Sequence, residues 1–160
     1  MLLLQSIRHI RITVLLLAFT CLLSGVRLFG QAQAARVDEA LTAVCGESEE
    51  RASYSERLQL IHRLPSNLAQ EQLERCREFL ESPLAGQTLP DLEFNGLKND
   101  MVLALLRQKE GLAELAEQLA RMSRAPETDA TWRDYCVQFL GKCYPVIADR
   151  DYSWRLSPTV

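Results

Sequence analysis

Four cysteines in the body of the chain carry the clearest capacity for chemistry. An even number of cysteines in a chain sent to an oxidising compartment favours disulfides, and an export signal precedes them here. The last two stand seven positions apart in one predicted helix, so they lie about 10.5 Å apart along its axis, beyond the roughly 7 Å limit for a bridge. The connectivities that link each of the first two to this helix remain. The four residues are Cys45, Cys76, Cys136 and Cys143.

Core packing is the competing interpretation of the same cysteines. Each falls on the apolar face of its predicted helix, and free cysteine is among the most buried residue types. A structural zinc site is disfavoured because the cysteines lack the close spacing of such sites and His62 is the only histidine after the export signal. We interpret His62 as a partly exposed helix residue rather than a ligand or a base.

Catalytic motifs are missing from the sequence. It contains no glycine-rich phosphate loop, no serine in a nucleophile elbow and no His-Glu-x-x-His pattern. The short acidic run of Glu47, Glu49 and Glu50 is more simply a solvated connection than an acid cluster. We therefore expect no enzyme, and we assign no catalytic residue, cofactor or metal.

The first 34 residues differ sharply from the rest, because they contain no acidic side chain while the remainder holds all 21. Basic side chains precede an apolar run over residues 12–26, and Ala32-Gln33-Ala34 supplies the small residues that a signal peptidase requires. The pattern predicts a secretory signal over residues 1–34 and a periplasmic or extracellular protein. A retained membrane anchor is the alternative, because the apolar run can be extended to roughly the 20 residues that span a bilayer.

The charge of the exported chain bears on its partners. Removal of residues 1–34 leaves 15 basic and 21 acidic side chains, so the net charge moves from −3 to −6. An acidic surface repels phosphate backbones, and the exported chain carries no basic stripe. We therefore expect no binding to nucleic acid, and contact with a membrane only through residues 1–34 if they are retained.

The exported chain is predicted to be all-α, with about six helices over residues 35–148. Its apolar residues recur at three and four positions, which is the period of a helix that buries one face. Gly46 is expected to end the first helix in a left-handed conformation. Ser53 and Glu56 form a capping box for the second, and Ser66 or Asn67 is predicted to cap the third.

The second half of the domain contains a predicted long loop followed by three predicted helices. The stretch from Ser82 to Gly96 contains turn residues without helical period, which predicts a long loop. Residues 97–108 are apolar on most sides, as in a helix packed between neighbours, and Gly111 separates them from a fifth helix. Asp129 is expected to cap a sixth helix, and Pro145 is expected to kink or end it.

Residues 129–142, which read DATWRDYCVQFLGK, resemble a HEAT-type repeat helix. The shared features are an acidic start, an apolar residue followed by arginine, apolar residues at helical spacing and a Leu-Gly pair. The aromatic residues Trp132, Tyr135 and Phe139 are bulkier than the small residues usual in that family. The resemblance implies stacked helical hairpins that form a fragment of an α-solenoid, and an interaction scaffold without catalysis of its own.

The C-terminal tail, residues 149–160, is the second candidate for a functional surface. Tyr152, Trp154 and Arg155 are residue types that dominate interface hot spots, and we expect them to contact a partner. Burial of Trp154 against the helix ends is the alternative. Together these features predict an exported, non-catalytic helical module that binds an unidentified protein. The alternative function is a thiol- or metal-binding periplasmic protein that uses the four cysteines.

Overall fold

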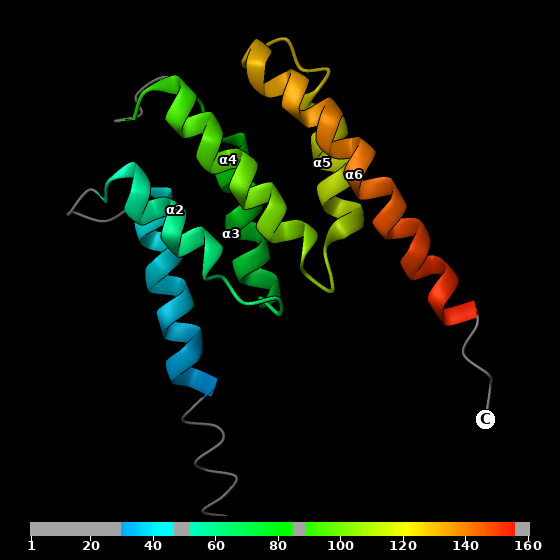
Figure 1. Cartoon of the computed structure of the whole chain (residues 1–160), viewed down its shortest axis with the longest axis horizontal. Helices are drawn as coiled ribbons and strands as arrows, with labels where there is room; N and C mark the ends of the chain where they lie inside the picture. Colours follow the sequence, from blue (N-terminus) through cyan, green and yellow to red (C-terminus); the bar gives the residue numbers. More distant parts are fainter. Residues whose placement is uncertain (1–29, 47–51, 85–88, 156–160) are drawn as a thin grey trace, which may run out of the picture. The chain divides into compact units, whose positions relative to one another are not determined.

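The computed structural model describes residues 30–46, 52–84 and 89–155, with only the backbone for residues 149–155. The described residues form helices and no strand, which confirms the predicted all-α class (Figure 1). The chain divides after Asp38 into two compact units, and the second holds nearly all of the described helices.

Six helices are present in the described part of the chain. A first helix covers residues 30–45 and precedes the five labelled in Figure 1. Those five are α2 (Tyr54–His62), α3 (Gln70–Glu81), α4 (Asp91–Leu106), α5 (Leu112–Met122) and α6 (Ala130–Arg155).

Helix α4 is the centre of the fold, because it packs against α2, α3, α5 and α6. It is apolar on most sides, as its sequence predicts, and its buried side chains include Phe94, Leu97, Met101 and Leu105. The successive helices α3 and α4 are in contact, as are α5 and α6. Regular HEAT-like stacking of these pairs stays a prediction.

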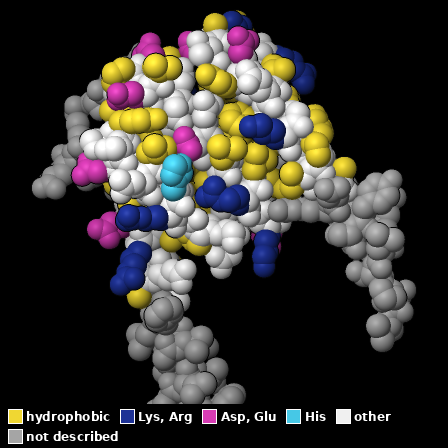
Figure 2. Space-filling view, viewed as in Figure 1, with side chains coloured by type: hydrophobic (Ala, Val, Ile, Leu, Met, Phe, Trp, Pro, Cys, Tyr) yellow, Lys and Arg dark blue, Asp and Glu magenta, His cyan; other side chains and the backbone are white. Residues whose placement is uncertain are grey.

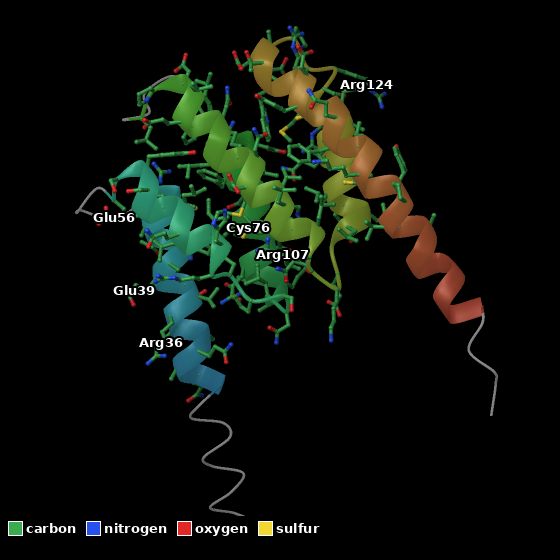
Figure 3. The ribbon with its side chains drawn as sticks, in the orientation of Figure 1. Arg36, Glu39, Glu56, Cys76, Arg107 and Arg124 are labelled. Carbon is green, nitrogen blue, oxygen red and sulfur yellow. The ribbon has the colours of Figure 1, made fainter. Side chains whose placement is uncertain are left out.

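Several helix ends follow directly from local sequence. Ser53 and Glu56 form the predicted capping box, in which the Ser53 amide donates to Glu56 Oε2 at 2.8 Å and the Glu56 amide donates to Ser53 Oγ at 3.4 Å. Figure 3 shows Glu56 in the first turn of α2. Gly46 and Gly111 adopt φ of 77° and 79°, a left-handed conformation that residues with a Cβ atom rarely take.

The predicted cap of the third helix is wrong. Neither Ser66 nor Asn67 caps it, because α3 begins at Gln70. The approach to the helix is held from elsewhere: the buried side chain of Gln108 accepts a hydrogen bond from the amide of Leu68 at 3.0 Å. The N-cap residue Ala69 donates its own amide to Gln72 Oε1 at 3.1 Å, and Gln108, 40 residues away, holds the residue before it.

The loop predicted from Ser82 to Gly96 is shorter than expected, because α4 begins at Asp91. Asp91 and Glu93 lie in its first turn, where negative charge is favourable at the positive end of the helix dipole. Gly96 serves packing rather than a turn, since a Cβ atom there would lie 3.0 Å from the hydroxyl oxygen of Tyr54.

Helix α6 continues through Pro145, although the sequence predicts a kink or an end there. Proline lacks the amide that would bond the carbonyl of Gly141. Both residues are exposed, so water can reach this turn and the lost hydrogen bond is less costly than in a buried helix.

The C-terminal tail begins as part of α6 rather than as an irregular segment, because residues 149–155 continue the helix. Nothing is described of the side chains of Tyr152, Trp154 and Arg155, so their role in partner binding stays a prediction.

The predicted signal lies mostly outside the described residues. Its last residues, 30–34, belong to the first helix and are exposed, so cleavage after Ala34 would shorten that helix and leave residues 35–45. None of the helices in the described ranges has the length and apolar character needed to cross a membrane.

Candidate functional site

Two buried cationic side chains are the main candidates for a functional role in the interior of the protein. The predictions from the sequence include neither of them. Arg57 on α2 and Lys98 on α4 are each 3% exposed. Arg57 donates through Nε to the carbonyl of Val44 at 2.7 Å, with a second contact from its terminal nitrogen. Lys98 Nζ donates to the carbonyl of Ser82 at 2.6 Å.

Both cations bind carbonyl groups at the end of a helix. Val44 lies in the last turn of the first helix, and Ser82 is the C-cap of α3. Carbonyls in these positions have no partner within their own helix, and they carry the negative end of the helix dipole. Arg57 and Lys98 therefore satisfy carbonyl acceptors that lack a partner in their own helix, and they neutralise a partial charge at the same time.

The ring of Phe94 joins the two cations. Arg57 Cζ lies 5.9 Å from the ring centroids of both Phe79 and Phe94, while Lys98 Nζ lies 5.2 Å from those of Phe94 and Trp132. Phe79 and Phe94 meet edge to face, with 5.4 Å between centroids. Aromatic faces attract cations through their quadrupole, so these rings offset part of the cost of burying charge.

Burial has a large effect on the protonation of Lys98. It lowers the pKa of Lys98 to about 8, while the nearby thiol of Cys136 and carboxylate of Asp129 act in the opposite direction. Burial lowers the pKa of Arg57 as well, but a guanidinium remains charged at any physiological pH. At neutral pH both sites are thus positively charged, and only the lysine can lose its charge within a mild pH range.

Lys98 borders a cavity of about 600 Å³, which we call the Lys98 cleft. The cleft lies between the end of α3, the middle of α4, the end of α5 and the start of α6. Apolar side chains form much of its wall, including Leu80, Met122 and Trp132. Charged side chains at its edge include Glu81, Arg121 and Glu127.

Asp129 and Trp132 close the α6 side of the Lys98 cleft. Asp129 Oδ1 accepts the amide of Trp132 at 2.9 Å, which confirms the predicted cap of α6. It also accepts from Asn95 Nδ2 at 3.4 Å. Trp132 is 1% exposed, and its indole Nε1 has no acceptor among the described residues. A buried donor without a partner is costly, so a bound acceptor would be favourable here.

A second depression, the α3–α5 groove, continues from the cleft. It has a volume of about 370 Å³ and shares Glu81 and Arg121 with the cleft. Its lining holds five carboxylates and two guanidinium groups. These residues are Glu74, Glu78, Glu81, Glu114 and Glu117, with Arg77 and Arg121.

The side chain of Gln118 lies at the base of this groove and is 6% exposed. Its Nε2 donates to the carbonyl of Arg77 at 2.8 Å and to Glu81 Oε1 at 2.9 Å. Its Oε1 has no donor among the described residues. Arg121 forms an ion pair with Glu81 beside it. The groove therefore combines excess negative charge with a buried acceptor that lacks a partner.

None of the predicted bridges between the four cysteines is formed in this structure. Cys45 is half-buried and the other three are buried, with Cys76 in the interior of the helices in Figure 3. Burial raises the pKa of Cys76 and of Cys136 to about 12, and it also raises the pKa of Cys143. A buried thiol that keeps its proton packs as an apolar group and is a poor nucleophile or ligand.

His62 is an exposed residue at the end of α2, and its Nε2 lies 2.8 Å from Asp100 Oδ1 on α4. Figure 2 shows the histidine at the surface. Within the described ranges no three His, Cys, Asp or Glu residues are grouped so as to hold a metal ion.

Comparisons with family models, with curated proteins and with solved structures find no match. The site therefore has to be interpreted from its own geometry. One signal in the sequence could have found it: Lys98 follows Phe94 by four positions and precedes Met101 by three, so it stands on the apolar face of its helix. Arg57 precedes Ile61 on α2 by four positions, so it also stands on the apolar face of its helix.

Proposed function

We propose that this protein is an exported, non-catalytic helical module that binds a segment of a partner protein in the Lys98 cleft. The observation that carries the proposal is a cleft of about 600 Å³ with a buried cation and an unpartnered indole donor in its apolar wall. Binding sites in general combine an apolar surface with a few placed polar groups. The HEAT-type resemblance and the export signal support the same proposal.

The donors at the cleft are suited to an oxygen acceptor. The ammonium of Lys98 has three N–H groups, of which Ser82 takes one, and Trp132 adds its indole N–H. A main-chain carbonyl of a bound segment could accept from these donors, while an adjacent apolar side chain packs against Leu80 and Met122. Tyr152, Trp154 and Arg155 provide a second proposed contact.

Photocrosslinking in the native envelope tests this proposal. A photoreactive residue at Glu127, on the edge of the cleft, should give a discrete adduct with one protein. The matched control is Leu92 on α4, which is 79% exposed and does not line the cleft. The substitution Ala125→Trp places a large ring in the cleft and should abolish the Glu127 adduct.

Each outcome of the crosslinking experiment either supports or contradicts the proposal. An adduct from Glu127 that is missing from Leu92 and lost in Ala125→Trp supports the cleft as the binding site. Equal adducts from both positions, or an adduct that survives Ala125→Trp in a folded protein, would contradict it. Circular dichroism of each variant shows whether the helices are retained.

A further inference from the structure

We propose that the bound segment is basic, and that its lysine or arginine side chains lie in the α3–α5 groove while an apolar neighbour occupies the Lys98 cleft. This inference rests on the proposed function and adds the chemistry of the partner. It starts from the groove, which no prediction from the sequence includes.

The charge of the groove favours a cationic occupant. Its five carboxylates exceed its two guanidinium groups by three negative charges. Glu74, Glu78 and Glu81 follow one another at four and three positions along α3, so their charges stand on one helix face. Like charges at this spacing repel, and a cation bound between them would relieve the repulsion.

The opposite wall of the groove carries the same charge. Glu114 and Glu117 stand three positions apart on α5 and face the same depression. Arg121 is engaged with Glu81, which leaves Arg77 as the other cation of the lining. Two rows of carboxylates on adjacent helices thus make a negative channel, which raises the local concentration of cations.

Gln118 distinguishes this groove from an ordinary solvated acidic face. Its carbonyl Oε1 is buried and has no donor among the described residues, whereas its amide nitrogen is already used. Most buried acceptors in proteins have a partner, and an unmet one is costly. A guanidinium or ammonium group from a bound segment would donate to this oxygen and pair with the neighbouring carboxylates.

The connection between groove and cleft sets the order of residues in the partner. Glu81 and Arg121 line both depressions, so a chain can pass from one to the other. The cleft offers the donors of Lys98 and Trp132 to a main-chain carbonyl, and the groove offers acceptors to basic side chains. The recognised segment therefore has an apolar residue next to basic residues.

Fluorescence anisotropy with labelled synthetic peptides tests the inference on protein purified from its native envelope. The peptides share one central leucine and a neutral background, and they carry lysines, glutamates or neither. We expect the lysine peptide to bind more tightly than the neutral one, and the glutamate peptide to bind least. Binding should weaken with salt, because charge screening shortens the range of the groove's attraction.

Charge-matched variants separate specific binding from general attraction. Glu78→Gln with Glu114→Gln removes two carboxylates from the groove, and we expect affinity for the lysine peptide to fall about tenfold. The control, Glu110→Gln with Asp134→Asn, removes two exposed carboxylates outside the groove and should change affinity less than about twofold. Gln118→Leu should also weaken binding while the carboxylates remain.

Two results would overturn the inference. The first is a lysine peptide that binds no better than the neutral peptide. The second is an equal loss of affinity in the groove and control variants, because that would mean unspecific attraction to an acidic protein. Neither result affects the crosslink from Glu127, so a failed basic groove remains distinguishable from a failed partner-binding cleft.

Discussion

Arg57 and Lys98 occupy comparable positions but differ in what lies beside them. Each is buried, binds a carbonyl at a helix end and lies near the ring of Phe94. Arg57 lines neither the Lys98 cleft nor the α3–α5 groove, whereas Lys98 borders the cleft. The first cation thus links α2 to the end of the first helix, while the second lies at the border of a cavity.

The chemistry of the two side chains fits this difference. A guanidinium is planar, always charged and able to make several hydrogen bonds in fixed directions, which suits a permanent joint between α2 and the first helix. An ammonium is a compact charge whose pKa shifts readily when buried. The buried side chain of Arg57 is therefore charged at any physiological pH, whereas that of Lys98 loses its charge as the pH rises above about 8.

Loss of Arg57 should give the largest effect. Arg57→Ala leaves the carbonyl of Val44 without its donor and removes a side chain that packs on Phe79 and Phe94. We expect a loss of about 3 kcal/mol in the free energy of unfolding, measured by urea denaturation. Arg63→Ala, an exposed arginine at the end of the same helix, is the control and should cost less than about 0.5 kcal/mol. Equal losses in both would remove the structural role assigned to Arg57.

Lys98→Met should change how stability depends on pH. The pKa of Lys98 in the folded protein is about 8, below its ordinary value of 10.5, so the unfolded chain binds more protons between these limits. Wild-type stability therefore gains from Lys98 as pH rises from 8 to 10.5, and the variant lacks this gain.

Denaturation of both proteins across this range measures the difference between their unfolding free energies, which cancels the contributions of Cys76 and Cys143, because Lys98 does not affect the pKa of either thiol. We expect wild type to improve relative to Lys98→Met by on the order of 2 kcal/mol, because the cleft admits some solvent to the ammonium. A difference that stays constant with pH would mean that Lys98 titrates normally and is not the adjustable site of the pair.

The sequence predicts those features that depend on neighbours along the chain. The capping box of Ser53 and Glu56, the cap at Asp129 and the left-handed Gly46 depend on residues within one turn, and all are confirmed. The contact of Gly96 with Tyr54 and the bond from Leu68 to Gln108 cross between elements, and the sequence pattern misses both. In the sequence Gly96 indicates a turn, because its packing against the hydroxyl of Tyr54 on α2 is visible only in the structure.

The candidate site could be predicted from the sequence only in part. Lys98 and Arg57 interrupt apolar faces of their helices, which indicates from sequence alone that a charge will be buried. Whether such a charge links two helices or borders a cleft depends on how α3, α5 and α6 pack around α4. That arrangement is set by packing across the whole domain, so periodicity cannot separate the two outcomes.

Thiol labelling gives the smallest effect and compares the surroundings of both cations. Cys45 interacts electrostatically with both Arg57 and Cys76, and Cys136 interacts in the same way with Lys98. Because burial raises the pKa of both Cys76 and Cys136 to about 12, neither should form a thiolate at neutral pH. The half-buried Cys45 should therefore be alkylated first by iodoacetamide in the native protein, followed slowly by the others.

The intact mass of the protein purified from its native source, alkylated after denaturation with and without reduction, tests the state of the cysteines. Four labels without reduction would show that no disulfide is formed, whereas labels that require reduction would establish the predicted disulfides instead. The same spectrum gives the N-terminus, and a mass that begins at Ala35 supports export by a cleaved signal. Native labelling of Cys136 as fast as Cys45 would show that the surroundings of Lys98 open to solvent, which would increase the contrast with Arg57.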